Sequence, residues 1–181
     1  MARKLDQVVV IDVESTCWEG APPDGEENEI IEIGVCALDV ASGQRVARED
    51  ILVRPARSRV SPFCTRLTTL TQEQVDGGAS FAEACGRLQR AYATKDRVWA
   101  SYGDYDRRQF ERQCATLGVP YPFGPGHLNV KTLFALVHTL PREVGMDGAL
   151  DMLELPLEGT HHRAGDDAWN IARILATLLR Q

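Results

Sequence analysis

The run VVVIDVESTC, at residues 8–17, constrains the fold of this chain more than any other segment. Its first four residues are all β-branched, which predicts a central strand that is covered on both faces. Asp12 and Glu14 then stand two residues apart, and this spacing places both side chains on one face of a strand. Two ionised carboxylates so close together are costly unless a cation lies between them, although a solvated strand end also fits this pattern. The run therefore predicts a buried strand that ends in two ligands for a hard divalent cation.

The other segments alternate β-branched runs with helical patterns. Residues 18–29 are rich in proline, glycine and acids, which predicts a long loop after the first strand. Residues 30–40 and 44–55 are β-branched runs joined by a turn, which predicts a hairpin. Apolar spacing and capping residues predict the later elements, which are a strand at 97–103 and helices at 80–93, 106–118, 129–140, 146–155 and 166–180. This order predicts an α/β sheet with helices on its faces.

Composition and cysteine spacing narrow the class of protein. A length of 181 residues, with 44% hydrophobic and 25% charged residues, suits one domain at 1–181 with a full core. No apolar run approaches the roughly 20 residues that cross a bilayer, and the N-terminal MARKLDQ lacks the apolar stretch of a secretory signal. Five cysteines are scattered without a C-x-x-C pair. We therefore expect a soluble, cytoplasmic protein with free thiols, no disulfide-linked partner, no membrane contact and no zinc cluster.

Charge is distributed unevenly along the chain. The formal net charge of −6 argues weakly against non-specific affinity for polyanions. Residues 54–66 are an exception, because they hold four arginines and no acid: Arg54, Arg57, Arg59 and Arg66. This segment fits a solvated loop, and it also fits a contact with a phosphate backbone.

The phase of the last helix distinguishes two neighbouring acids. Residues spaced by four, seven and eleven positions from Asp167 are all apolar: Ile171, Ile174 and Leu178. The same spacing from Asp166 gives the polar residues Asn170, Arg173 and Thr177. Since one face of an amphipathic helix packs on the core, we expect Asp167 to point inward and Asp166 to face water.

A second helix also begins with an acid in phase with its apolar side. Asp106 is in phase with Phe110, Cys114 and Leu117, and it also stands where an N-cap is expected. Capping alone is one explanation of Asp106, and it is compatible with metal binding. Four acids from three distant segments are therefore expected to meet, close to the pair His161 and His162 that precedes the last helix.

Three motifs together resemble a known family. VIDVESTC, GDYD (103–106) and HRAGDDA (162–168) are similar, in order and separation, to the motifs of the DEDD-type 3′-to-5′ exonucleases of the ribonuclease H-like superfamily, in the subgroup with a catalytic histidine. SPFCTRLTTLTQEQV (61–75) and DDAWNIARI (166–174) look like the branch that trims RNA 3′ ends, typified by the histone-mRNA and small-interfering-RNA exonucleases. The resemblance covers residues 6–180 and implies a mixed β-sheet with helices on both faces.

The resemblance also implies a reaction and a set of roles. RNA, or another single-stranded nucleic acid with a free 3′ end, is expected to be hydrolysed to 5′-mononucleotides with two divalent cations, Mg²⁺ or Mn²⁺, as cofactors. The implied metal ligands are Asp12, Glu14, Asp106 and Asp167. His162 is implied as the general base, and the helix phase selects the pair His162 and Asp167 over His161 and Asp166, which have the same spacing.

Nucleotide contacts follow from the same resemblance. Glu14 is expected near the terminal 3′-hydroxyl, and Thr16 is expected to contact the nucleotide. Leu67 and Tyr105 stand where the family wedges or stacks the last base, although both also fit ordinary core or rim positions.

Three other functions remain open at this level. A DNA-directed exonuclease of the same fold has the same catalytic residues, because these residues contact phosphates rather than sugars. An internal-cutting nuclease of the ribonuclease H type also uses clustered acids and two metals. A non-catalytic nucleic-acid or protein-binding module is disfavoured, because clustered acids repel the phosphates that such a module binds.

Overall fold

The structure, a computed structural model, describes residues 4–180 and contains one five-stranded sheet. Its strands are β1 (Lys4–Ser15), β2 (Ile30–Asp39), β3 (Arg45–Leu52), β4 (Arg97–Ser101) and β5 (His127–Asn129), and they are ordered β3-β2-β1-β4-β5. β1 pairs with β2 antiparallel and with β4 parallel, so the sheet is mixed and β1 is its central strand. The predicted central position of the first strand is confirmed.

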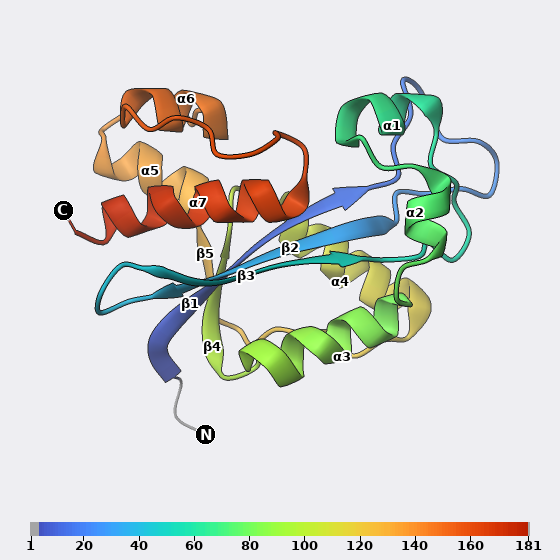
Figure 1. Ribbon diagram of the computed structural model, residues 1–181, viewed down its shortest axis with the longest axis horizontal. Helices are drawn as coiled ribbons and strands as arrows, with labels where there is room; N and C mark the ends of the chain where they lie inside the picture. Colours follow the sequence, from blue (N-terminus) through green and yellow to red (C-terminus); the bar gives the residue numbers. More distant parts are fainter. Residues whose placement is uncertain (1–3, 181) are drawn as a thin grey trace.

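Helices cover both faces of this sheet (Figure 1). They are α1 (Pro62–Thr68), α2 (Gln72–Asp76), α3 (Phe81–Tyr92), α4 (Tyr105–Leu117), α5 (Val130–Val137), α6 (Met146–Met152) and α7 (Ala164–Leu178). Val9 and Ile11 of β1 pack with α3 and α4 on one face, whereas Val8 and Val10 pack with α5, α6 and α7 on the other. Asp12 and Glu14 continue the second set by strand alternation, so they point toward the α7 side. The predicted α/β sheet with helices on both faces is confirmed.

α7 lies unusually close to the sheet at its N-terminal end. A side chain at Gly34 of β2 would meet the carbonyl oxygen of Ala164 at 1.9 Å, and one at Gly165 would meet the Asp50 carboxylate at 1.9 Å. Only glycine allows this approach. The two glycines therefore bring the start of α7, with Asp167, next to the end of β1.

Several predicted boundaries were wrong. The segment 54–76, whose first residues were expected to extend a strand to 55, contains a loop and the two short helices α1 and α2. Ser61 caps α1 with its hydroxyl, and Thr71 and Gln74 form a capping box for α2. β5 was also missed, because its three residues are too few to show a strand period. Among residues 4–180, no helix has both the length and the apolar content needed to cross a bilayer.

Candidate active site

A cavity of about 310 Å³ opens where β1 ends beside α4 and α7. We call it the carboxylate cleft. It is lined by all five residues that the resemblance assigned to catalysis: Asp12, Glu14, Asp106, His162 and Asp167. Tyr102, Tyr105 and His161 also line it. Residues from three distant segments therefore meet in one place, as the sequence predicted.

Three of the acids lie within the reach of a single ion. Asp12, Glu14 and Asp167 each offer a carboxylate oxygen, and these oxygens all lie within 4.8 Å of one another. Glu14 and Asp167 are 9% and 4% exposed. The arrangement of β1 therefore agrees with the predicted face for Asp12 and Glu14, and the three carboxylates form an all-oxygen donor set.

Asp106 reaches the cleft from the first turn of α4, not from its cap. Asp104 holds the N-cap position of α4 and makes no side-chain capping bond. Asp106 is 4% exposed, and its Oδ1 accepts a hydrogen bond of 3.0 Å from the backbone N–H of Val13. The N-cap prediction for Asp106 was wrong, because Asp106 lies two residues after the N-cap and its carboxylate fixes α4 against β1 instead.

The two acids at the start of α7 differ as the helix phase predicted, but with one correction. Asp167 faces the cleft and accepts a 3.0 Å hydrogen bond from the backbone N–H of His162. Asp166 was expected to face water, yet its carboxylate binds Arg48 and accepts a 2.9 Å hydrogen bond from the Thr160 N–H. Asn170, on the same side, is fully buried. The loop before α7 and strand β3 cover this side, which is why it is not solvated.

Both histidines reach the cleft, whereas only one was assigned a role. Their rings stack with centroids 4.0 Å apart. His161 Nδ1 lies 3.2 Å from Asp167 Oδ1, and its Nε2 lies 3.7 Å from Asp147 Oδ2. His162 Nδ1 lies 4.0 Å from Glu14 Oε1, and the His162 backbone has a φ of +63°, in the left-handed region. His161 therefore lies against the acids of the cleft and not in open water.

The acids of the cleft are held in an environment that favours their neutral forms. Burial raises the pKa of Glu14 to about 8, and the Asp167 carboxylate adds to the effect. Burial likewise raises the pKa of Asp106 to about 7. The pKa of Asp12 is raised well above its ordinary value, first by burial and then by Asp106 and Glu14. Buried carboxylates with raised pKa values and only oxygen donors fit divalent cations, which would replace the missing positive charge.

This electrostatic strain predicts a pH-dependent stability for the metal-free protein. A carboxyl group whose folded pKa is raised stabilises the fold below its unfolded pKa, and that contribution is lost as the pH rises through the folded pKa. For Glu14 and Asp106 the loss extends from about pH 4, the ordinary value, to about 8 and about 7 respectively. We expect the Tm of the metal-free protein to fall between pH 5 and pH 8.

The measurement is differential scanning fluorimetry with and without Mn²⁺. Because the cations bind the ionised carboxylates, Mn²⁺ should raise the Tm more at pH 8 than at pH 5. Glu14→Gln should flatten the pH dependence of the metal-free Tm. An equal Mn²⁺ shift at both pH values in the parent protein would contradict this prediction.

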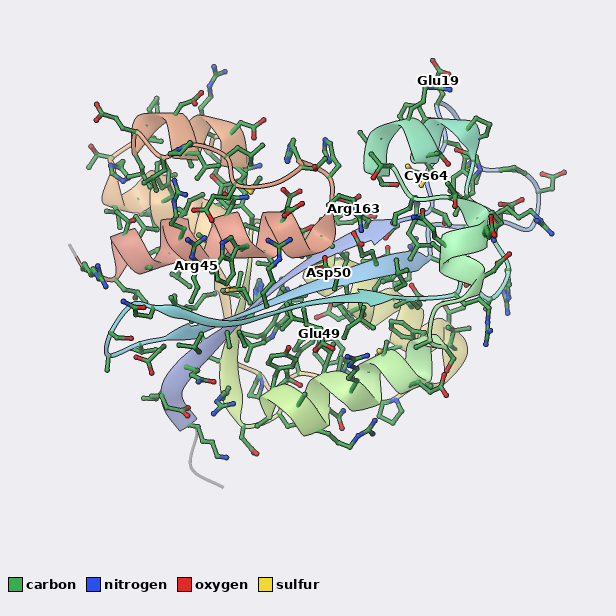
Figure 2. The ribbon with its side chains drawn as sticks, viewed as in Figure 1. Glu19, Arg45, Glu49, Asp50, Cys64 and Arg163 are labelled. Carbon is green, nitrogen blue, oxygen red and sulfur yellow. The ribbon has the colours of Figure 1, made fainter. Side chains whose placement is uncertain are left out.

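An ion pair between a partly exposed arginine and a buried glutamate, which the sequence analysis missed, lies next to the cleft. Arg163, labelled in Figure 2 at the start of α7, donates to both carboxylate oxygens of Glu32, with the shorter distance 2.6 Å. Glu32 is fully buried and also accepts a 2.8 Å hydrogen bond from the Ala164 N–H. Glu32 is the β2 partner of Glu14 in the sheet register. The signal that could have revealed this pair is a glutamate inside the apolar run IIEIGV.

The predicted nucleotide contacts have different surroundings. Tyr105 lines the cleft and is 54% exposed, so its ring is available to a ligand. Leu67 is 37% exposed on α1 and is not among the described residues that line the cavity. Thr16 is fully buried, and its hydroxyl donates to the Glu27 carbonyl and accepts from the Glu29 N–H. The structure therefore favours Tyr105 on geometry, and the contacts of Leu67 and Thr16 stay predictions.

The arginine-rich segment at 54–66 has the geometry of a solvated loop leading into α1. Arg54, Arg57, Arg59 and Arg66 are all exposed. The Glu29 carboxylate accepts hydrogen bonds from the backbone N–H groups of Ala56, Arg57 and Ser58, which fixes the loop. A role in phosphate contact stays a prediction.

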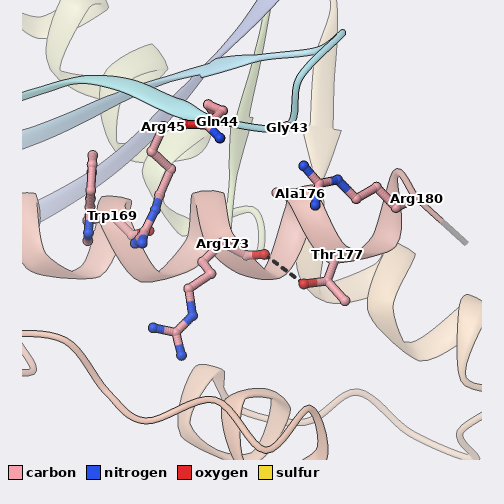
Figure 3. Close-up of a pocket in the computed structure, with 8 residues that line it drawn as sticks. All are labelled: Gly43, Gln44, Arg45, Trp169, Arg173, Ala176, Thr177 and Arg180. Carbon is pink, nitrogen blue, oxygen red and sulfur yellow. Dashed lines mark hydrogen bonds between the residues drawn. The ribbon is translucent and has the colours of Figure 1, made fainter.

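A larger cavity lies away from the acids of the carboxylate cleft. It has a volume of about 650 Å³ and lies between the β2–β3 hairpin and the C-terminal half of α7 (Figure 3). Three arginines line it, but Arg45 and Arg173 are both ion-paired with Glu158, and Arg180 donates to the Ser42 carbonyl. Because these groups already have partners, the smaller carboxylate cleft is the stronger candidate for a reaction site.

Comparisons with known proteins find relatives along nearly the whole chain. A family model described as Exonuclease, RNase_T, matches residues 9–175. The chain is 30% identical over 186 residues to 3′-5′ exoribonuclease 1 of Rattus norvegicus, and the match covers 97% of this chain and 53% of that protein. The chain thus spans about half the length of the curated relatives it matches first.

Solved structures agree with these matches. The nuclease domain of 3′hExo, described as a DEDDh family member bound to rAMP, matches with a TM-score of 0.89 and 28% identity over 99% of this chain and 94% of that one. A structure described as 3′-end specific recognition of histone mRNA stem-loop by 3′-exonuclease matches with a TM-score of 0.88 and 28% identity. That match covers 99% of this chain and 65% of the other.

Proposed function

This chain belongs to the exonuclease (RNase_T) family, and we propose that it is a metal-dependent 3′-to-5′ exonuclease that releases 5′-mononucleotides from the 3′ end of RNA. The resemblance to DEDDh exonucleases with a ribonuclease H-like fold is confirmed by the matching structures. The observation that carries the proposal is the meeting of Asp12, Glu14, Asp106, Asp167 and His162 in one cleft. RNA is proposed as the substrate because the matching relatives are named exoribonucleases.

Members of this family use divalent metal ions, and we propose Mg²⁺ or Mn²⁺ here. Asp12, Glu14 and Asp167 would hold one ion, and Asp12 with Asp106 would hold the second. The donor set is entirely carboxylate oxygen, which suits hard cations and lacks the soft ligands of a zinc site. When bound, the cations would stabilise negative charge on the attacking and leaving oxygens of an in-line displacement.

The chain's own residues supply proton transfer and positioning. His162 Nε2 has no hydrogen-bond partner among the described residues, so it is free to accept the proton of the attacking water. Burial, with His161 as the second cause, lowers the pKa of His162, which keeps this base neutral to a lower pH. The bond from the His162 N–H to Asp167, together with the Arg163–Glu32 pair, holds the histidine loop over the carboxylates.

One set of assays distinguishes the proposed function from the three alternatives. A DNA-directed exonuclease would degrade DNA in preference to RNA of the same sequence, and an internal-cutting nuclease would open a circular RNA. A binding module without chemistry would leave every substrate intact. It would also gain nothing from four buried carboxylates, which repel phosphate.

We expect stepwise release of 5′-mononucleotides from a 5′-labelled linear RNA, and no cutting of the same RNA as a circle. The reason is that the cleft seats one terminal nucleotide among the acids. The measurement is electrophoresis of the labelled RNA with mass analysis of the products in Mn²⁺, with matched DNA in parallel. Chelation should abolish the reaction, and activity that survives exhaustive chelation would contradict metal dependence.

We further propose that residues 1–181 form one exonuclease domain and that it acts in the cytoplasm. All five cysteines lie in the described part of the chain as free thiols, and four of them are buried. This state suits a reducing compartment.

A further inference from the structure

A second cavity adjoins the carboxylate cleft on the side of α4 and α5. It has a volume of about 430 Å³ and shares Tyr102 and Tyr105 with the cleft. Arg108 and Lys131 stand in its lining, one from each of these helices. The carbon stem of Lys131 lies near Gly103, where an added side chain would meet Lys131 Cδ at 3.9 Å. We call this cavity the α4–α5 pocket.

The two cations of the α4–α5 pocket have no partner within residues 4–180. Neither Arg108 nor Lys131 has a carboxylate oxygen within 4.0 Å or a side-chain hydrogen bond in this part of the chain. The pocket also contains Asp104 and Glu143, but Asp104 is 3.2 Å from Arg107, and Glu143 accepts a hydrogen bond from the Thr132 hydroxyl. Arg108 and Lys131 are therefore free to bind an anion.

The lack of ion-pair partners for Arg108 and Lys131 within residues 4–180 distinguishes the α4–α5 pocket from the larger cavity of Figure 3. There, Arg45 is 3.1 Å from Glu158 and also lies over the Trp169 ring at 4.0 Å. Arg173 shares the same glutamate. An anion in that cavity would compete with Glu158, whereas an anion in the α4–α5 pocket displaces no ion pair of Arg108 or Lys131.

The direction of the substrate strand follows from the two ends of the cleft. Beyond Glu14, the chain at the end of β1 contacts the start of α1, where the Cys64 thiol donates to the Ser15 carbonyl and the Ser61 hydroxyl donates to the Cys17 carbonyl. Under the proposed function, on which this step rests, the terminal nucleoside with its 3′-hydroxyl lies at the Glu14 end. The rest of the strand must then leave past Asp106 and Tyr105, which leads into the α4–α5 pocket.

We propose that the α4–α5 pocket binds the RNA phosphate that lies one nucleotide 5′ of the scissile phosphate, through Arg108 and Lys131. The two cations bind this phosphate as charged hydrogen-bond donors, on the far side of Tyr105, whose ring at the shared rim is expected to stack on the last base. The pocket thus supplies the positive charge that an acidic protein needs to hold a polyanion beside four carboxylates.

The test compares RNA substrates that do or do not carry this second phosphate. A dinucleotide with a free 5′-hydroxyl has only the scissile phosphate, and a trinucleotide adds the next one. We expect the parent protein to cleave the trinucleotide with a kcat/KM about tenfold higher. The double variant Arg108→Gln/Lys131→Gln should lose this preference through a higher KM for the trinucleotide, while its kcat changes little.

Salt dependence gives a second readout on a longer single-stranded RNA. Losing the contact with this one phosphate should reduce the slope of log(1/KM) against log[salt] by about 0.7, the contribution of one neutralised phosphate on single strands. Arg90→Gln is the matched control, because Arg90 is an exposed arginine of α3 that lines neither the carboxylate cleft nor the α4–α5 pocket. It should leave both the trinucleotide preference and the salt slope unchanged.

The outcomes separate this proposal from the proposed function. A parent that releases nucleotides from RNA, beside a double variant with an unchanged trinucleotide preference and salt slope, would overturn the phosphate site alone. Equal losses on dinucleotide and trinucleotide would also overturn it, since they indicate damage to the cleft. A parent that releases no nucleotide from any RNA would overturn the proposed function and this inference with it.

Discussion

Asp12→Asn is expected to lower the rate of single-turnover RNA cleavage by about 10⁴-fold, a loss typical of removing a central catalytic group. A carboxylate oxygen of Asp12 lies within 4.8 Å of those of Glu14 and Asp167, and burial, followed by the charges of Asp106 and Glu14, raises the pKa of Asp12. The amide keeps the shape of the side chain but removes the charge that would hold both cations. Metal affinity should therefore fall together with turnover.

The same substitution should not destabilise the metal-free protein. The carboxylate of Asp12 is buried against like charges, so its neutral replacement relieves repulsion at pH 8. We expect a Tm at or above that of the parent under metal-free conditions, together with a smaller Mn²⁺-induced rise. This pairing of lost activity with retained stability distinguishes a metal ligand from a core residue.

The measurements are single-turnover cleavage of a 5′-labelled RNA, calorimetric titration with Mn²⁺, and thermal unfolding at pH 8. Asp151→Asn is the matched control, because Asp151 is an exposed acid of α6 outside the cleft. It should match the parent in all three. Turnover of Asp12→Asn within tenfold of the parent would show that Asp12 does not hold the cations.

The parts of the site that the sequence predicted are those set by a local period. Asp12 and Glu14 share a face because strand side chains alternate, and Asp167 faces the sheet because Ile171, Ile174 and Leu178 follow it at helical spacing. Each inference used residues within one element. The sheet order also followed from one strand, since a run apolar on both faces belongs in the middle.

The parts of the fold and of the site that the sequence did not predict depend on contacts between elements. α1 and α2 have seven and five residues, too few for an apolar period, although their caps were visible in the sequence. The Glu32–Arg163 pair joins positions far apart in the chain. Asp166, which was expected to face water, instead forms an ion pair with Arg48 of β3. His161 reaches the cleft because the loop before α7 turns back at His162. No pattern in the sequence predicts the positive φ of His162.

His162→Ala is expected to lower turnover by about 10²-fold to 10⁴-fold, the usual range for loss of a general base, with metal affinity largely retained. His161→Ala should cost less than tenfold. His161 Nδ1 contacts Asp167 and its Nε2 faces Asp147, so the His161 ring positions a carboxylate and is not free to take a proton. His162 has its Nε2 free, and its left-handed backbone, with a φ of +63°, is a strained conformation of the kind that persists at functional sites.

The two variants should also differ in their dependence on pH. Because burial and then His161 lower the pKa of His162, the parent should keep its active, neutral base to a pH below the ordinary histidine value of 6.5. His162→Ala should lose this acidic limb of the pH–rate profile, whereas His161→Ala should keep a limb, shifted to higher pH because one cause of the lowered pKa of His162 is removed. The measurement is single-turnover cleavage from pH 5 to pH 9 at saturating Mn²⁺, with folding verified by circular dichroism. A severe loss of turnover in His161→Ala beside near-normal turnover in His162→Ala would assign the proton transfer to His161. The pairing of the catalytic histidine with Asp167 would then have to be reassigned as well.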